Sequence, residues 1–348
     1  DAHYLSEDGK WKLDSQMFMS DIDDVETGFG GFIDLEYTFR QGVVQRVGIE
    51  YLDDHVDLND LGFLSRKDNF RIRTAHVRRN SNVGWARDNE FDIRGFVQRN
   101  RDGLFTGGAV FVSNRMTFEN LSKLTFRASF NPEYYDDLNS FGNGAYRLAR
   151  RHFGGLMWES DSSQPFSYAI GAGYSQEDLG GGTDFVKLIA NWRPSDRFAL
   201  SANIGYRNRD GWLLYQEDRN FTTFQAEEWS PRVSADYFLS AKQQLRFSVQ
   251  WVGVRAKEDK FYLVPGNPGD LIRTAKPEGP TDSFSLSQMT LQLRYRWEIA
   301  PLSDLFLVYT RLVDEGSALK SFSDTFSDGY DDPLGDFLVL KIRYRFGS

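Results

Sequence analysis

The charged side chains with the most regular spacing in this chain occupy every second position of apolar stretches. In LQLRYRWEI, residues 291–299, Arg294, Arg296 and Glu298 share one parity, while leucine, tyrosine and tryptophan share the other. The guanidinium group of arginine has several N–H donors in one plane, so it binds carboxylate and sugar oxygens well. The parity therefore predicts a solute-contacting face that contains Arg46, Arg94, Arg127, Arg232, Arg246, Arg294, Arg296, Glu298, Arg343 and Arg345. A second interpretation stays open, in which arginine and acidic side chains pair across strands and stiffen the sheet.

Catalytic motifs are not evident in the sequence. The four histidines, His3, His55, His76 and His152, are scattered, and neither HExxH nor GxSxG occurs. We therefore expect that the protein is not an enzyme. His55 lies in the acidic stretch DDHVDLND, which we interpret as an exposed loop, with a hydrolytic site on an outer rim as the alternative.

Two acidic stretches, residues 52–60 and 323–336, contain the carboxylates that calcium prefers as ligands. Neither has the spacing of an EF-hand, so we interpret both as solvated loops, with divalent-cation binding near lipopolysaccharide as the alternative. The glycine run 180–182 is not followed by a helical pattern, which argues against a phosphate-binding loop. We expect no metal ion and no cofactor.

Composition narrows the class of protein. The chain has 348 residues, a net charge of −9 and no cysteine, which excludes disulfides and argues against a nucleic-acid partner. No stretch approaches the roughly 20 apolar residues of a spanning helix. No basic region followed by an apolar core is visible at the start, so we expect a mature or truncated chain.

Period-two alternation recurs along the whole sequence and predicts an all-β chain. Short polar connections near residues 40–42, 80–82, 120–123, 160–164, 193–196, 240–243 and 300–304 alternate with a second, mostly long set. That set lies near residues 20–28, 52–68, 100–103, 131–144, 176–183, 208–225, 258–282 and 314–335. The count between them is about sixteen strands of roughly 9–14 residues, the even number of a closed bacterial barrel. No composition shift divides the chain, so we expect a single domain over residues 1–348.

The alternation alone does not say which face looks inward. A soluble sandwich buries its apolar face, whereas a membrane barrel turns it to lipid. The strands are as long as the 9–11 residues that a tilted spanning strand needs. Aromatic residues near strand ends fit interfacial girdles, and they include Trp85, Trp158, Trp192, Tyr206, Trp251 and Trp297. We therefore predict a transmembrane antiparallel up-and-down β-barrel in the bacterial outer membrane, with a soluble β-protein as the alternative.

Two stretches resemble known families. LVLKIRYRF, residues 338–346, resembles the terminal strand of bacterial outer-membrane proteins, which implies that Tyr344 and Phe346 are read by the barrel-assembly machinery; Gly347 and Ser348 depart from that pattern. GIEYLDDHVDLNDLGFLSRKDNFRIR, residues 48–73, resembles a barrel family of unassigned function. Its members carry an N-terminal module similar to family 9 carbohydrate-binding modules, which implies an outer-membrane location and carbohydrate handling.

Function is open between two main hypotheses. The first is a porin-like channel for passive passage of small polar or anionic solutes, carbohydrates among them, with a connection such as 258–282 or 314–335 folded in as a constriction. The second is a plugged barrel that anchors a partner in the periplasm or at the surface, or an N-terminal carbohydrate-binding-like domain. Outer-membrane lipid and lipopolysaccharide are expected partners in both.

Overall fold

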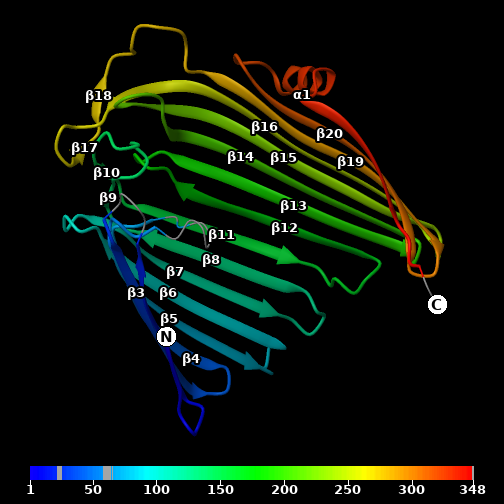
Figure 1. Cartoon of the computed structure of the whole chain (residues 1–348), viewed down its shortest axis with the longest axis horizontal. Helices are drawn as coiled ribbons and strands as arrows, with labels where there is room; N and C mark the ends of the chain where they lie inside the picture. Colours follow the sequence, from blue (N-terminus) through cyan, green and yellow to red (C-terminus); the bar gives the residue numbers. More distant parts are fainter. Residues whose placement is uncertain (22–25, 58–63, 65, 347–348) are drawn as a thin grey trace.

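The structure is a computed structural model that describes residues 1–21, 26–57, 64 and 66–346 (Figure 1). It contains a large antiparallel sheet, a small sheet and one short helix. The large sheet is formed by β1 (Ala2–Leu5), β2 (Trp11–Ser20), β3 (Gly28–Arg40), β4 (Val43–Leu52), β5 (Asn69–Ser81), β6 (Asp88–Arg99), β7 (Phe105–Thr117), β8 (Lys123–Asn131), β11 (Arg151–Glu159), β12 (Phe166–Gln176), β13 (Gly182–Ser195), β14 (Phe198–Tyr215), β15 (Asn220–Ser240), β16 (Gln243–Leu263), β18 (Ile272–Thr274), β19 (Phe284–Ala300), β20 (Ser303–Ser317) and β21 (Gly335–Arg343). The small sheet is formed by β9 (Tyr134–Asp136), β10 (Tyr146–Leu148) and β17 (Gly269–Asp270).

Each long strand pairs with the next long strand along the chain, which is the predicted up-and-down order. Tight turns at one end of the sheet enforce it. Gly42, between β3 and β4, has a φ of 79°, a conformation that side chains other than glycine rarely adopt. A Cβ there would lie 2.6 Å from the carbonyl oxygen of Arg79, so this turn also needs glycine for space.

The predicted strand number agrees with the structure, but several predicted lengths are too short. Eighteen strands form the large sheet, of which sixteen have nine residues or more; β1 and β18 are the short ones. β15 and β16 have 21 residues each. The expected long connection 208–225 is wrong, since β14 and β15 continue through it and leave only residues 216–219 as a turn. The sequence of this segment looks like a loop because its polar and apolar residues do not alternate strictly.

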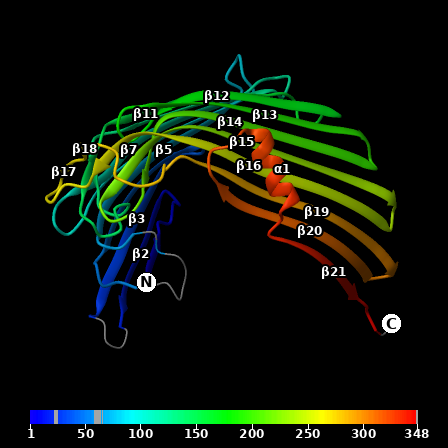
Figure 2. The same ribbon diagram turned by 90° about the horizontal axis from the view of Figure 1, so that it is seen from above.

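The expected closed barrel is not seen. Among the described residues, no hydrogen-bonded pairing joins β1 to β21. Figure 2 shows the sheet curved into an arch, with the β2–β3 end facing the β20–β21 end across the opening. The sheet is therefore a curved, open wall with one edge strand at each end.

One face of the wall is apolar and exposed. On β12, Phe166, Tyr168 and Ile170 are 55%, 42% and 51% exposed, and Ile170 faces Leu188 of β13. Such a large apolar surface is covered by lipid in outer-membrane barrels. Among the described residues, no helix has the length and hydropathy needed to cross a bilayer.

The aromatic residues form two belts on this face. Trp85, Trp158, Trp192 and Trp297 lie beside the short turns, as in the 5.8 Å ring contact of Trp192 with Phe198. Tyr206 and Trp251 lie further from the short turns, and the ring centroids of Tyr206 and Trp229 are 4.8 Å apart. The eight-residue step from Phe198 to Tyr206 approaches the 9–11 residues of a spanning strand. β14, β15 and β16 therefore continue well past the second belt.

The long connections gather at the end of the sheet opposite the short turns. β10 and β17 pair there in parallel, and residues of β10 join a small apolar core of Tyr146, Leu148, Leu213, Phe221 and Val264.

The expected inward fold of residues 314–335 is wrong. Those residues include the helix α1 (Phe322–Asp331), which was not predicted and which packs on Trp251 and Val313 of the apolar face.

Candidate functional site: the charged face of the sheet

The strand register places the predicted charged residues on one face. Arg46 lies opposite Ala75, which lies opposite Arg94, and Arg246 lies opposite Arg294. Nine of the ten predicted residues occupy strands in this way. Arg345 does not, because β21 ends at Arg343; the backbone N–H of Arg345 instead donates to Ser303 Oγ at 3.0 Å.

The terminal strand therefore begins and ends three residues earlier than predicted. Tyr344 and Phe346 follow β21, with ring centroids 4.9 Å apart, and both are exposed. Their expected role in assembly stays a prediction. Gly347 and Ser348 lie outside the described residues.

Ion pairs between strands engage many of the arginines. The closest nitrogen–oxygen distances across strands are 2.6 Å for Arg46–Glu36, 2.7 Å for Arg246–Asp236 and 2.9 Å for Arg296–Asp304. Arg343 also pairs with Asp304. For these residues the geometry matches the wall-stiffening interpretation. Arg94 instead pairs with Asp92 of its own strand, β6, at 2.7 Å.

Three cations of the charged face lie near one another without an acidic partner. Within the described part of the chain, Arg127, Lys187 and Arg232 have no acidic partner within ion-pair distance. All three line one hollow of about 560 Å³ together with Arg207, whose guanidinium is paired with Glu228 at 3.2 Å. The hollow is therefore a positively charged region of the face.

Small residues create the space for this hollow. Phe153 and Phe185 stack with centroids 5.7 Å apart and lie along its wall. A Cβ on Gly173 would lie 2.4 Å from the ring of Phe185, so glycine at 173 lets that ring lie flat on the sheet. The aromatic pair and the free cations give the hollow both an apolar and a cationic lining.

A second hollow, formed by β2–β7, contains both cations and carboxylates. It is lined by Lys12, Arg46, Arg71, Arg73 and Arg94, and also by Asp14, Asp34 and Glu36. Ion pairs with acidic residues engage all of these cations except Arg71 in the described structure. The hollow of Arg127, Lys187 and Arg232 differs because no described acidic residue lines it.

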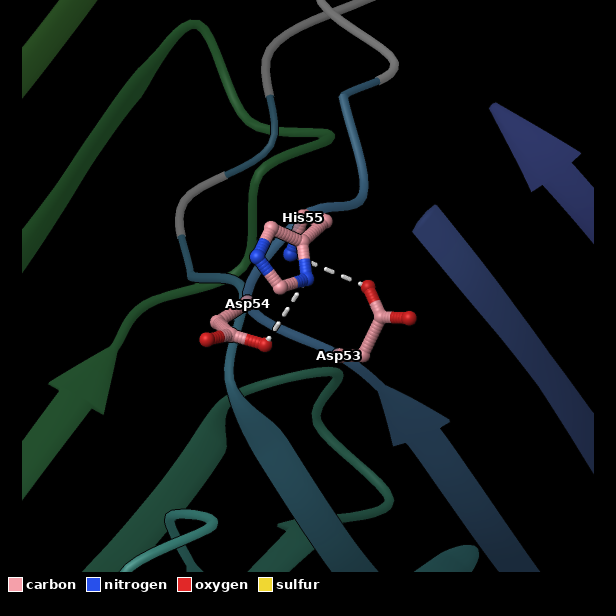
Figure 3. A group of neighbouring side chains, drawn as sticks. All are labelled: Asp53, Asp54 and His55. Atoms are coloured by element: carbon pink, nitrogen blue, oxygen red, sulfur yellow. Dashed lines mark hydrogen bonds and ion pairs between the residues drawn. The ribbon is translucent and has the colours of Figure 1, made fainter. Parts of the chain in front are cut away.

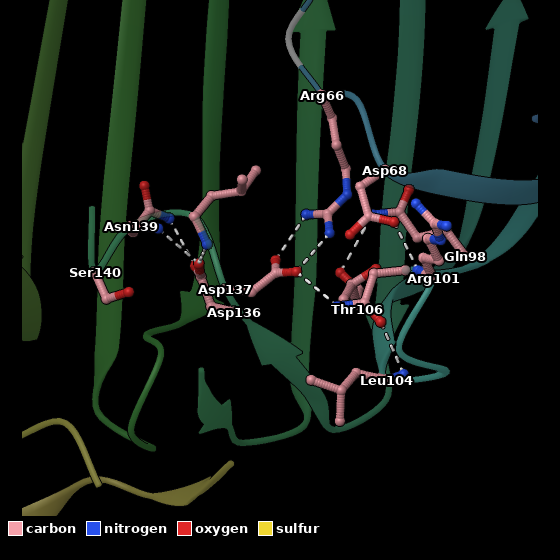
Figure 4. Close-up of polar contacts among 12 residues, drawn as sticks. Arg66, Asp68, Gln98, Arg101, Leu104, Thr106, Asp136, Asp137, Asn139 and Ser140 are labelled. Carbon is pink, nitrogen blue, oxygen red and sulfur yellow. Dashed lines mark hydrogen bonds and ion pairs between the residues drawn. The ribbon is translucent and has the colours of Figure 1, made fainter. Parts of the chain in front are cut away.

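The connection after β8 meets two other connections at the rim of the sheet (Figure 4). Arg66 donates two hydrogen bonds to Asp137, at 2.9 and 2.8 Å, and Asn100 donates a third to the same carboxylate at 3.1 Å. The backbone N–H of Arg101 donates to Asp68 at 2.7 Å. These residues were not predictable, because they lie in connections where no periodic pattern exists.

His55 forms a small group with Asp53 and Asp54, whose side chains offer metal-ligand atoms within 4.8 Å of one another (Figure 3). Backbone donors occupy Asp53: Phe29 N–H at 2.6 Å and Val56 N–H at 2.8 Å. Arg101 pairs with Asp54 at 2.6 Å. Both carboxylates thus have structural partners in the turn that follows β4.

The other predicted acidic stretch is also engaged in structure. Asp328 of α1 pairs with Lys320 at 2.8 Å, and Asp336 pairs with Arg311 at 2.9 Å. Within the described residues, the group around His55 is the single cluster with metal-ligand geometry. Residues 58–60 of the first acidic stretch lie outside the described residues.

The remaining histidines do not meet one another. His3 contacts Asp14 at 2.8 Å on β1–β2, and His76 contacts Gln45 at 3.2 Å on β4–β5. His152 lies on β11 near the ring of Tyr174. Within the described residues, these three histidines therefore lie at separate places on the sheet.

The antiparallel order, the exposed apolar face with two aromatic belts and the charged opposite face define the wall of an outer-membrane β-barrel protein. The chain belongs to the family described as Domain of unknown function (DUF5916), whose model matches residues 2–346. This match covers the stretch whose resemblance predicted a barrel family of unassigned function. The expected N-terminal module similar to family 9 carbohydrate-binding modules stays a prediction.

Solved structures with a similar arrangement are remote. An outer membrane protein of Vibrio cholerae, OmpT with its loop L8 deleted, shares 10% identity, with 88% of this chain and 92% of that chain covered and a TM-score of 0.36. The siderophore receptor PirA from Acinetobacter baumannii shares 8% identity, with 98% and 71% covered and a TM-score of 0.42. No protein of the curated set matches the chain.

Proposed function

We propose that the chain forms a porin-like channel for passive diffusion of small polar solutes, with a preference for anions. The observation that carries this proposal is the hollow of Arg127, Lys187 and Arg232, whose charges are not neutralised by acidic neighbours in the described structure. Free cations on a water-exposed face raise the local concentration of anions. No covalent step is part of this function, and we propose no catalytic residue or cofactor.

The proposal places the charged face toward the lumen, because the opposite face has the apolar surface that lipid requires. A barrel of sixteen or more strands leaves an aqueous interior. Arg294, whose side chain donates to Gln292 at 3.1 Å, and Glu298 add polar groups to that interior near the short turns. Carbohydrates are included among the solutes because guanidinium groups also bind hydroxyl oxygens.

Ion selectivity in a planar bilayer tests the proposal. The full chain is compared with the triple variant Arg127→Gln, Lys187→Gln, Arg232→Gln, and the matched control replaces both arginines by lysine and retains all three charges. We expect steady conductance in each, with anion preference reduced in the glutamine variant and retained in the control. Absence of conductance from a correctly folded barrel would reject the channel.

A plugged barrel is the second candidate, and the network of Arg66 and Asp137 favours it because that network holds connections across the rim. In this proposal, the barrel anchors a partner protein at the surface or in the periplasm, or an N-terminal carbohydrate-binding-like domain. The plug would be supported if the folded wild-type protein does not conduct and the Asp137→Ala variant does. Unchanged conductance in that variant would count against it.

Lipid, lipopolysaccharide and the barrel-assembly machinery are proposed partners in both cases. The terminal aromatic residues provide the test for assembly. Phe346→Ala should lower the amount of folded protein in the outer membrane while refolding of the purified chain in detergent is unaffected. Equal loss in both settings would indicate a structural role for Phe346 instead.

A further inference from the structure

The hollow of Arg127, Lys187 and Arg232 has the dimensions of a binding site for a small molecule. Its volume of about 560 Å³ lies within the roughly 300–1,000 Å³ of such sites. Gly171 of β12 and Gly205 of β14 line it, and Lys187 of β13 lies between them in the strand register. Because neither glycine has a side chain, the ammonium group of Lys187 stands above an open floor.

The positions beside the three cations on the adjacent strands are all uncharged. They are Ser113 and Gly155 beside Arg127, Gly171 and Gly205 beside Lys187, and Asn203 and Gln250 beside Arg232. Arg246, in contrast, lies opposite Asp236 and pairs with it. The three side chains are exposed, and no acidic residue of the described chain lines the hollow. Their charge is therefore available to an anion from solution.

Two phenylalanine rings make one side of the hollow apolar. Phe153 and Phe185 are partly exposed, and their rings are parallel to within 2°. Both ring ends lie over Gly155, since a Cβ there would be 3.2 Å from Phe153 Cζ and 3.3 Å from Phe185 Cζ. Arg127 lies directly opposite Gly155, and Lys187 is two residues beyond Phe185 on the same face of β13. An unpaired cation therefore lies on each side of the aromatic surface.

We propose that this hollow binds aromatic carboxylates, with the ring of the solute against Phe153 and Phe185 and its carboxylates on Arg127 and Lys187. Three strand spacings of about 4.8 Å separate β8 from β13, which leaves room for one aromatic ring between the two long cationic side chains. A planar ring packs favourably on phenylalanine, and guanidinium and ammonium groups donate charge-assisted hydrogen bonds to carboxylate oxygens. This inference rests on the proposed function for the anionic character of the solute and adds the aromatic body.

A comparison of three small molecules tests the inference on the refolded full chain in zwitterionic detergent, with calorimetry as the measurement and protein-free micelles as the blank. Isophthalate has two carboxylates on an aromatic ring. Glutarate has two carboxylates at the same carbon spacing without a ring, and isophthalamide has the ring without the charge. We expect isophthalate to bind about tenfold more tightly than glutarate, which corresponds to about 1.4 kcal/mol, and more tightly than isophthalamide. Equal affinity for isophthalate and glutarate, or tightest binding of isophthalamide, would overturn the inference.

Phe153→Leu removes one ring but retains an apolar side chain and all three cations. We expect the affinity for isophthalate to fall toward that for glutarate, while the affinity for glutarate stays at the wild-type value. Phe96→Leu is the matched control, because Phe96 also stacks with a second ring, that of Phe111, and lines the second hollow instead. Unchanged isophthalate binding in Phe153→Leu, or the same loss in Phe96→Leu, would argue against a site at the phenylalanine pair.

Lys187→Gln serves if the phenylalanine variant does not fold. It removes one cation and retains both rings, so we expect weaker binding of isophthalate and of glutarate in the same proportion, with isophthalamide binding unaffected. Wild-type affinity for isophthalate in this variant would contradict the inference.

Ion selectivity of the wild-type channel is a separate measurement that tests the proposed function. An anion-preferring channel that binds isophthalate no more tightly than glutarate would overturn this inference and leave the proposed function standing. Tighter binding of isophthalate by a folded barrel that does not conduct would reject the channel and retain the binding site.

Discussion

Arg66 and Asp137 join two connections that are 71 residues apart in the sequence, through two parallel hydrogen bonds. Their side chains are 13% and 18% exposed, so the pair is largely shielded from solvent. A two-pronged arginine–carboxylate pair of this kind fixes both distance and orientation. It therefore holds the connection after β8 against the rim more firmly than a single surface contact would.

Loss of this pair should loosen the rim. Arg66→Ala leaves Asp137 with only the amide of Asn100, and we expect the free energy of unfolding of this region to fall by about 2 kcal/mol. Hydrogen exchange of residues 132–139 measures the change. Arg79→Ala is the matched control, because the Arg79–Glu90 pair is 67% and 40% exposed and contributes little. Similar exchange in the two variants would contradict the prediction.

Asp304 should be important for the last strand of the sheet. It is 1% exposed and pairs with both Arg296 and Arg343. Asp304→Asn leaves two guanidinium groups without their carboxylate, so we expect a lower midpoint of heat-induced unfolding, measured as loss of the compact electrophoretic form. Asp314→Asn on the same strand is the control. A wild-type midpoint in Asp304→Asn would show that β21 does not depend on this carboxylate.

The two edge strands should meet in a bilayer. Unpaired backbone groups are costly in lipid, and only closed barrels span membranes with strands. The chain has no cysteine, so any disulfide that forms must join introduced cysteines. We expect a panel that combines Ala2→Cys or Tyr4→Cys with Leu338→Cys, Leu340→Cys or Ile342→Cys to give an intramolecular disulfide in one register. Exclusively intermolecular disulfides would indicate that each edge pairs with a second copy.

Acid should slightly loosen the pairing of β17 with β10. The hydrogen bonds from Arg147 hold the pKa of Asp270 below its ordinary value of 3.8. A lowered pKa in the folded state contributes stability above the unfolded value and loses it as pH falls through the folded value. Hydrogen exchange of residues 146–148 should therefore become slightly faster below pH 3.8 in wild type, since the Arg147–Asp270 pair is largely exposed. Asp270→Asn should show this slightly faster exchange at every pH, and a persistent pH dependence in that variant would contradict the assignment.

The strand pattern was predictable because lipid and water on opposite faces impose a strict period of two. The stretch with Arg294 and Arg296 illustrates this, since its predicted faces match the register. The extension of β14 and β15 was not predictable in the same way. Beyond the second aromatic belt both faces meet water or protein, so residues 208–225 lose the strict apolar alternation and look like a loop.

The candidate sites were predictable only in part. Parity placed Arg127 and Arg232 on the charged face, but only the structure shows that they lack acidic partners while Arg246 has Asp236. The network at the rim has no sequence signal. Arg66 and Asp137 meet where three connections converge, and the convergence depends on contacts between residues far apart in the chain.

The pairing order has a kinetic consequence. Because each long strand binds its sequence neighbour, the sheet can form by successive addition of hairpins, with little loop-closure entropy to overcome at each step. The exception is the junction of β1 with β21 that we predict in the bilayer, because it would join strands far apart in the sequence at the largest entropic cost. This junction is therefore expected to form last and to set the rate at which the finished protein enters the membrane.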